Sequence, residues 1–373
     1  MDGKRLIEKI RLRNILSFGD KGEEIKLEPL NVIIGQNASG KSNLVDVIKL
    51  LRSLTQDKGL IEFISKSGGI GEWIWKGKKK FGIAEIEVTF LQNEEVYPFY
   101  ELEFTETNQR LNVTSEILRD KKTDETIAAG LAFGDDSMFT QKYEGIIKNG
   151  KYNAFQNIKP QFSKLAFYTD LQTNRGSEIR KLQLADLPND FLDEDAGNLS
   201  LVLNDLDFRG NVKDKIVEYL KKFNPRITDY KIRVLGGTLQ LNVYEEGLEK
   251  PISAMRLSDG TLRYLCLLAI LCHPEPPPLI CIEEPETGLH PDILPTIAEL
   301  MIEASQRTQL IVTTHSDILV SAFSEVPEAV LVCEKDEDGT HFKRLEKDKL
   351  KAWLKEYELG DLWLRGEIGG KRW

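Results

Sequence analysis

The chain has 373 residues, 41% of them hydrophobic, which is enough to bury the core of one large domain with an insertion, or of two lobes. Its formal net charge is −10, whereas proteins that mainly coat nucleic acid usually carry a basic excess, so contact with DNA or RNA would need a local patch or a partner. The mean hydropathy is −0.32 and no stretch approaches the roughly 20 apolar residues that span a bilayer, which excludes a membrane-spanning protein.

The amino terminus and the cysteines indicate a cytoplasmic protein. Residues 1–4 are polar and charged, without the apolar segment of a secretory signal. The cysteines stand singly in apolar runs without CxxC spacing, so small buried side chains in a reducing compartment explain them better than disulfides or zinc ligands. They are Cys266, Cys272, Cys281 and Cys333.

The first segment, residues 1–57, is predicted to fold as strand, loop and helix. Residues 6–15 alternate apolar and basic, which indicates a strand, and the apolar run 30–34 indicates a buried one. A glycine-bearing loop follows at 35–40, and residues 41–54 carry apolar side chains at helical spacing.

The middle segment, residues 58–250, changes in character. It alternates at period two and is then polar and rich in turn residues over 108–150, which predicts an antiparallel sheet with loops. Mixed elements follow. The expected elements are strands at 83–91 and 99–104, a helix at 212–223, and strands at 230–235 and 238–244.

The last segment, residues 251–373, alternates strands and helices as a parallel sheet requires. No heptad repeat is sustained in the chain, so long coiled-coil arms are not expected. The predicted elements are a helix at 259–272, a strand at 279–282, a helix at 291–305, a strand at 309–313 and a helix at 316–323.

The loop between the buried strand and the first helix matches a nucleotide-binding pattern. Residues 35–42, GQNASGKS, fit the P-loop spacing GxxxxGK[ST], and the strand–loop–helix context argues against a chance match. The glycines let backbone N–H groups face phosphate oxygens, Lys41 supplies charge to the β- and γ-phosphates, and the Ser42 hydroxyl ligates Mg²⁺. We therefore predict ATP and Mg²⁺ as cofactors, with contacts from Gly35, Asn37, Ala38, Ser39, Gly40, Lys41, Ser42 and Asn43.

The predicted strand at 279–282 ends in two carboxylates, Glu283 and Glu284. A parallel sheet would deliver both to the edge where the P-loop opens. Glu283 is then placed to hold Mg²⁺, directly or through water, and Glu284 to orient or deprotonate the attacking water. Two acids after a strand are more often a solvated strand end, but a P-loop in the same chain favours the catalytic interpretation.

Two further short motifs complete the pattern. Residues 257–261, LSDGT, open a helix about two dozen residues before Glu283; alone they would be a helix cap, but their position resembles the ABC signature sequence. His315 ends the next predicted strand and is similar to the ABC switch histidine, which senses the γ-phosphate. The predicted catalytic residues are thus Lys41, Glu284 and His315, and Ser258 and Gly260 join the nucleotide contacts.

Together these motifs resemble the RecF/SMC-like branch of the ABC ATPases, and within it the short AAA-family ATPases found beside prokaryotic defence genes, relatives of the ATPase part of OLD-family nucleases. The likeness rests on residues 35–42, 257–261 with Arg263, the run EEPETGLHP at 283–291, and 314–316. The EEPE form and the large middle segment disfavour a transporter subunit, whose motif is DEP. The resemblance implies an α/β P-loop NTPase of ABC type: a mixed sheet flanked by helices, with an inserted β-rich and helical lobe.

The resemblance also assigns roles to the three segments. Residues 1–57 would be the amino-terminal ATPase lobe with the P-loop, 58–250 an insertion or arm, and 251–373 the carboxyl-terminal ATPase lobe. Because each chain holds one P-loop and one signature, it implies a head-to-tail homodimer that sandwiches two ATP molecules and parts on hydrolysis.

Two features depart from the family pattern. Asp259 stands where the signature usually has a glycine, which brings negative charge toward the partner's γ-phosphate unless the side chain points away. Ser258 and Gly260 are therefore expected to make the contact, with slower turnover than in a transporter. The glutamine of the Q-loop is not located by the sequence, and Gln92 and Gln161 are the two candidates.

The resemblance leaves two biological roles open. One is an ATP-driven switch in DNA repair or anti-phage defence that acts on a separate effector, such as a nuclease; the acidic residues 334–339 fit a hairpin turn better than a metal cluster. The other is direct, ATP-dependent clamping of nucleic acid. Its best support is residues 73–80, WIWKGKKK, although a solvated turn with buried tryptophans explains that run more simply.

Overall fold

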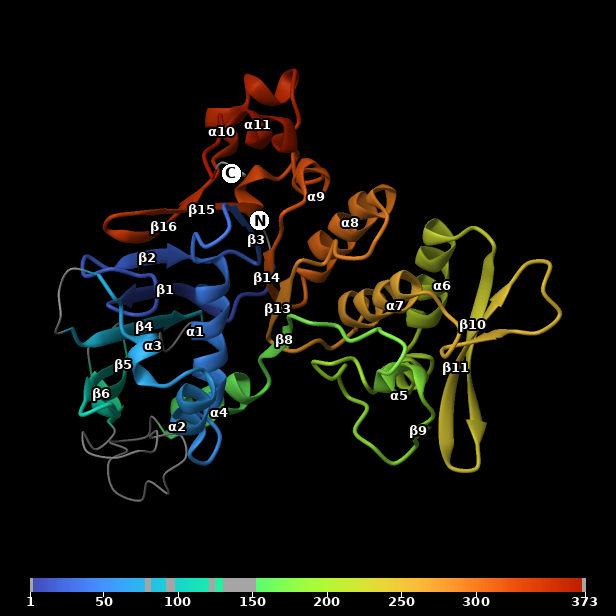
Figure 1. Cartoon of the computed structure of the whole chain (residues 1–373), viewed down its shortest axis with the longest axis horizontal. Coiled ribbons are helices and arrows are strands. Elements are labelled where there is room, and N and C mark those ends of the chain that lie inside the picture. Colours follow the sequence, from blue (N-terminus) through green and yellow to red (C-terminus); the bar gives the residue numbers. More distant parts are fainter. Residues whose placement is uncertain (1–2, 78–81, 92–97, 121–124, 130–151, 371–373) are drawn as a thin grey trace.

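The computed structural model describes residues 3–77, 82–91, 98–120, 125–129 and 152–370. Its centre is a six-stranded sheet in which all neighbours except the edge strand β16 are parallel (Figure 1). The order is β16 (Gly339–Arg344), β15 (Val330–Asp336), β3 (Leu30–Gly35), β14 (Gln309–Thr313), β13 (Leu279–Glu283) and β8 (Ala166–Tyr168).

Side chains of the central strands alternate between two hydrophobic cores. On β13, for example, Ile280 and Ile282 face one core while Leu279 and Cys281 face the other. Strands buried on both faces are continuous apolar runs, which is why the sequence displays them so clearly.

One core lies between the central sheet and a second, antiparallel sheet. Helix α1 (Lys41–Ser53) fills it: Leu44, Val45 and Ile48 pack with residues of both sheets. The second sheet runs in the order β2 (Glu23–Lys26), β1 (Ile7–Arg13), β4 (Ala84–Phe90), β5 (Pro98–Thr107), β6 (Arg110–Asp120) and β7 (Glu125–Ala129).

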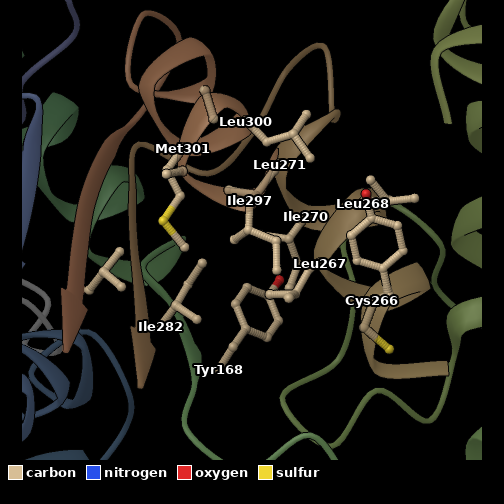
Figure 2. Close-up of a cluster of buried hydrophobic side chains, with 14 of the residues drawn as sticks. Tyr168, Cys266, Leu267, Leu268, Ile270, Leu271, Ile282, Ile297, Leu300 and Met301 are labelled. Carbon is tan, nitrogen blue, oxygen red and sulfur yellow. The ribbon is translucent and has the colours of Figure 1, made fainter. Parts of the chain in front are cut away.

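The other core lies beneath helices α7 (Asp259–Leu271) and α8 (Leu294–Ala304). Figure 2 shows Leu267 and Ile270 of α7 beside Ile297 of α8, with Ile282 and Tyr168 below them. Helices α5 (Leu199–Leu206) and α6 (Val212–Phe223) extend this core toward a third, smaller sheet. Its strands are β9 (Gln183–Leu184), β10 (Ile227–Leu235), β11 (Thr238–Glu245) and β12 (Ile252–Ser253).

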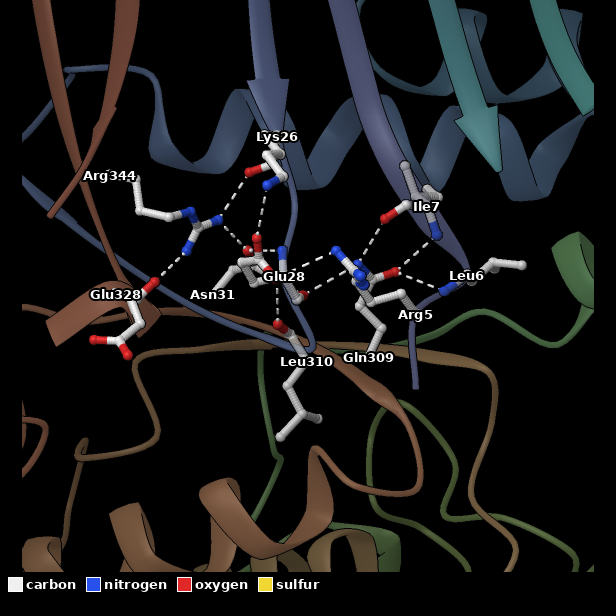
Figure 3. A network of polar contacts seen from close by, with 10 residues as sticks. All are labelled: Arg5, Leu6, Ile7, Lys26, Glu28, Asn31, Gln309, Leu310, Glu328 and Arg344. Atoms are coloured by element: carbon white, nitrogen blue, oxygen red, sulfur yellow. Dashed lines mark hydrogen bonds and ion pairs between the residues drawn. The ribbon is translucent and has the colours of Figure 1, made fainter. Parts of the chain in front are cut away.

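A polar network joins the two larger sheets (Figure 3). Gln309, fully buried at the start of β14, accepts hydrogen bonds from the backbone N–H groups of Leu6 (3.1 Å) and Ile7 (2.9 Å) and donates one to the Ile7 carbonyl (2.8 Å). Asn31 on β3 donates to the Leu310 carbonyl and accepts from Arg344. The network holds the antiparallel sheet above the strand that carries the P-loop.

The remaining described helices are shorter than α1 and α7. None of the described helices exceeds 13 residues or could cross a membrane. They comprise α2 (Gly59–Lys66), α3 (Ile70–Trp73), α4 (Tyr152–Ser163), α9 (Asp317–Ser321), α10 (Lys347–Leu350), α11 (Leu359–Arg365) and four 3₁₀ turns, Glu178–Arg180, Pro291–Ile293, Pro327–Ala329 and Trp353–Lys355.

The elements predicted from the sequence are present, with shifts at their ends. The helix expected at 291–305 starts as a 3₁₀ turn because Pro291 opens it, and becomes α-helical only at Leu294. Residues 334–339 form the end of a β15–β16 hairpin, as predicted, and the described residues hold no group of three or more potential metal ligands. Strands β1 and β4 pair across the boundary at residue 57, and the division into three segments stays a prediction.

Candidate nucleotide-binding site

The P-loop connects the carboxyl end of β3 to the amino end of α1. Ala38 and Gly40 both have positive φ, +61° and +109°, which turn the backbone around the loop. A side chain at Gly40 would place its Cβ 2.3 Å from the Thr340 hydroxyl oxygen. The backbone can lie this close to Thr340 only because glycine has no Cβ.

Lys41 lies inside this loop. Its side chain is 6% exposed, and its ammonium group donates to the carbonyls of Gly35 and Gln36, both at 2.8 Å. Burial lowers the pKa of Lys41, while the neighbouring Cys333, Glu284 and Glu283 act in the opposite direction. The lysine is therefore a partly desolvated charge at the centre of the loop.

Glu284 marks the turn at which the chain leaves β13. It has φ +45°, rare for a residue with a side chain, and its N–H donates to the Thr313 carbonyl at 2.9 Å. This turn leaves its carboxylate exposed, with Oε1 3.7 Å from Nε2 of His315. Glu283 and Thr313 are register partners on β13 and β14.

The backbone around His315 is held by Glu286. The Glu286 Oε1 accepts from the Thr314 hydroxyl and the His315 N–H, both at 2.7 Å. Burial raises the pKa of Glu286, against the lowering effect of these hydrogen bonds. The sequence prediction did not include Glu286 as a site residue, although the EEPE run displayed it; its role is to position the loop that carries His315.

A cavity of about 400 Å³ brings the predicted residues together. It includes Lys41, Ser42, Glu284 and His315, whereas Glu283 and Gly35, at the ends of β13 and β3, are not among the residues that line it. Lys335, at the end of β15, was missed because only the pairing of β15 with β3 brings it here. The lining residues are Asn37, Ala38, Gly40, Lys41, Ser42, Asn43, Glu284, Thr313, His315 and Lys335.

Two further cavities adjoin this one. The first, about 570 Å³, shares Asn43 and Lys335 with it and reaches Trp75. The second shares Asn37, Ala38 and Lys335 and includes Ser39, whose hydroxyl is buried without a hydrogen-bond partner.

The run 73–80 gives little support to a nucleic-acid patch. Trp73 is a core residue, 2% exposed, and Lys76 forms an ion pair with Glu72. Trp75 lies beside the cavity just described, and residues 78–80 lie outside the described part of the chain.

The signature residues do not line the P-loop cavity. Ser258 caps α7, accepting a hydrogen bond from the Thr261 N–H at 3.0 Å. Gly260 passes the Gly288 carbonyl so closely that a Cβ would lie 3.0 Å from it. The carboxylate of Asp259 pairs with Arg180, so its charge is neutralised within the chain.

Neither candidate for the Q-loop glutamine is supported by its position. Gln92 lies outside the described residues, and Gln161 on α4 lines a different cavity, with Lys4 and His273. Gln172 is exposed in the loop after β8, and β8 runs parallel to β13, so this loop leaves the sheet at the edge that carries Glu283 and Glu284. Sequence inspection overlooked it because β8 is only a three-residue strand.

The central parallel sheet, with the P-loop between β3 and α1, gives the chain the fold of a P-loop NTPase. The match to a family model extends over residues 30–321. The chain belongs to that family, described as "AAA domain, putative AbiEii toxin, Type IV TA system". A search of curated proteins gave no match.

Solved structures with the same fold are SMC head domains. An SMC head bound to the C-terminal winged-helix domain of ScpA is 16% identical, with a TM-score of 0.61 over 92% of this chain and 99% of that one. The Pyrococcus furiosus SMC head with an extended coiled coil, bound to the C-terminal domain of ScpA, is 15% identical, with a TM-score of 0.62 over 94% of this chain and 99% of that one. The Thermotoga maritima SMC head is 16% identical, with a TM-score of 0.51 over 91% of this chain and 99% of that one.

Proposed function

We propose that this protein binds Mg·ATP in the P-loop cavity and hydrolyses it. The observation that carries the proposal is that one cavity holds Lys41, Ser42, Glu284 and His315, drawn from three separate parts of the chain. Their chemistry fits phosphoryl transfer, in which positioning and charge do most of the work. Lys41 would neutralise the β- and γ-phosphates, Glu284 would orient the attacking water, and His315 would contact the γ-phosphate.

The residues present also fit Mg²⁺. Ser42 offers an exposed hydroxyl beside Lys41, and Glu283 a partly exposed carboxylate at the carboxyl end of β13. Hard oxygen donors of this kind, completed by phosphate oxygens and water, suit this ion. When bound, Mg²⁺ would offset the negative charge of the phosphates. We propose Ser42 and Glu283 as its protein ligands.

The adjoining cavity that reaches Trp75 is proposed to hold the base. It continues from the P-loop cavity through Asn43 and Lys335, and Trp75 is a half-buried aromatic ring that offers a stacking surface. Lys335 would contact the phosphates or ribose between the two. Gln172 is proposed as the Q-loop residue.

Hydrolysis is proposed to require a second copy of the chain. Ser258 and Gly260 do not line their own P-loop cavity, which supports the proposal that they serve the nucleotide of another copy. Two copies related by a two-fold axis would each supply a P-loop to one ATP and a signature to the other.

Two substitutions test the enzymatic proposal. Lys41→Ala should abolish Mg·ATP binding in a calorimetric titration, because it removes the charge at the centre of the loop. Glu284→Gln should bind Mg·ATP with wild-type affinity yet lose at least about 100-fold in turnover. Turnover at the wild-type rate in Glu284→Gln would show that another group activates the water.

For the biological role, we propose that the protein is a cytoplasmic, ATP-driven switch in DNA repair or anti-phage defence and acts on a separate effector. We further propose that its ATPase head is of the same class as the ATPase part of OLD-family nucleases. The family description, which names a putative toxin of a toxin–antitoxin system, supports a defence role. Affinity purification with and without ATP, followed by mass spectrometry, tests it. A partner retained only with ATP would identify the effector.

Direct nucleic-acid clamping is the alternative, and the pairing of Lys76 with Glu72 weakens it. Binding of duplex DNA with a non-hydrolysable ATP analogue, falling steeply with salt, would restore it.

A further inference from the structure

The side chain of Arg180 is buried between two loops that are distant in the sequence. It closes the 3₁₀ turn Glu178–Arg180 and is 5% exposed. Its Nε donates to the carbonyls of Thr173 (2.9 Å) and Asn174 (3.1 Å), in the loop after β8.

The other end of the same guanidinium holds the signature loop, residues 254–259. One terminal nitrogen donates to the carbonyls of Ala254 (3.1 Å) and Leu257 (2.7 Å), and the other pairs with the Asp259 carboxylate. Arg263, one turn into α7, forms a second connection to the loop after β8, since it donates a hydrogen bond to the Leu171 carbonyl at 3.1 Å. We call Arg180 and Arg263 the arginine clasp.

The clasp joins two parts of the proposed ATPase. The loop after β8 leaves the central sheet beside β13, at the edge that carries Glu283 and Glu284. The signature loop leads into α7, which Ser258 caps. One clasp therefore connects the chain's own nucleotide site to the surface that would meet the nucleotide of a second copy.

The chemistry of arginine explains why this residue type is needed. A guanidinium stays charged and presents several N–H donors in a rigid plane, so one group serves several carbonyls and a carboxylate together. Asp259 would otherwise direct a free negative charge toward a triphosphate, and like charges repel strongly where water is excluded.

We propose that Arg180 is a positioning residue that holds the signature loop in the conformation able to cap the ATP of a second copy. The proposal rests on the two-chain ATPase proposed above. It predicts that loss of Arg180 damages the nucleotide site of the partner and leaves the chain's own P-loop intact, which a general folding role would not do.

Mixing variants tests this directly. Arg180→Gln alone should bind Mg·ATP within about twofold of wild type and lose at least about 10-fold in turnover. Mixed one to one with Lys41→Ala, it should regain activity, because the mixed dimer has one site with an intact P-loop and an intact signature loop. The loop of Gln172 in that site is still held by Arg263 through the Leu171 carbonyl. If the chains mix at random, half of the dimers contain one chain of each variant, and each of these has one intact site of two. The mixture should therefore turn over at about a quarter of the wild-type rate.

Ser258→Arg mixed with Lys41→Ala is the reference, since it puts a bulky side chain directly in the signature. If this reference mixture stays inactive, the two-chain site itself is refuted. If it recovers while the Arg180→Gln mixture does not, or if Arg180→Gln turns over at the wild-type rate or loses Mg·ATP binding, the positioning role is refuted. Arg180→Lys, which keeps the buried charge but not the fork of donors, should behave as Arg180→Gln and guards against a folding defect.

Discussion

At the scale of single residues, Gly40 shows how backbone freedom makes the P-loop. Gly40→Ala should destabilise the protein by about 1–3 kcal/mol and prevent Mg·ATP binding, because the new Cβ would overlap the Thr340 hydroxyl in a backbone conformation already strained for alanine. Gly210→Ala is the matched control, since Gly210 also has positive φ (+60°) but no atom lies within 4 Å of its added Cβ. Thermal unfolding and calorimetry measure both effects; equal losses in the two variants would contradict the steric argument.

Trp75 can report on the proposed base site. Trp75→Phe should remove most of the change in tryptophan fluorescence on addition of Mg·ATP, while leaving affinity within a few fold because a ring remains. Trp75→Ala should weaken ATP binding about 10-fold and leave binding of inorganic tripolyphosphate unchanged. An equal loss for both ligands would place the base elsewhere.

Glu286 predicts a dependence of stability on pH. The pKa of Glu286 in the folded protein is raised above the ordinary value of 4.5. Between pH 4.5 and this raised pKa, Glu286 therefore holds more protons in the folded protein than in the unfolded chain. Its contribution to the free energy of unfolding falls as the pH rises through that interval. Glu286→Gln cannot release a proton and keeps an oxygen to accept from Thr314. The difference in melting temperature, Glu286→Gln minus wild type, should therefore become more positive from pH 4 to pH 7. A difference that stays constant with pH would contradict the prediction.

At the scale of elements, the junction between β1 and β14 depends on one side chain. Gln309→Leu would leave the N–H groups of Leu6 and Ile7 and the Ile7 carbonyl without their partner, at a cost of about 3 kcal/mol or more. The exposed Gln306 offers the control, and Gln306→Leu should change stability by less than about 0.5 kcal/mol. Urea unfolding measures both; a small effect at Gln309 would mean that water replaces the lost bonds.

At the scale of the whole molecule, the separation of signature and P-loop predicts a change of assembly with nucleotide. Glu284→Gln with Mg·ATP should double in mass by light scattering, because ATP bridges two chains and is not consumed. Without nucleotide, or with Lys41→Ala added, the same chain should remain a monomer. A monomer at saturating Mg·ATP would overturn the two-chain proposal.

Local chemistry allowed much of the fold and the P-loop to be predicted from the sequence. Doubly buried parallel strands are continuous apolar runs, and a phosphate loop needs its glycines, lysine and serine at fixed spacing within a few residues. The elements at 30–35, 41–53 and 309–313 are therefore predicted nearly to the residue. The same patterns predict the site residues 35, 37–43, 258, 260, 283, 284 and 315.

Only the tertiary structure brought in Lys335, Glu286, Gln172 and Arg180, because each acts through neighbours far away in the chain. Lys335 depends on the pairing of β15 with β3, and Gln172 on a three-residue strand too short to recognise by periodicity. Asp259 is the sharpest case: the sequence showed only its negative charge, and the fold supplied Arg180, 79 positions away, to neutralise it. Local patterns encode elements and loops, whereas the pairing of charges across the molecule is decided by packing.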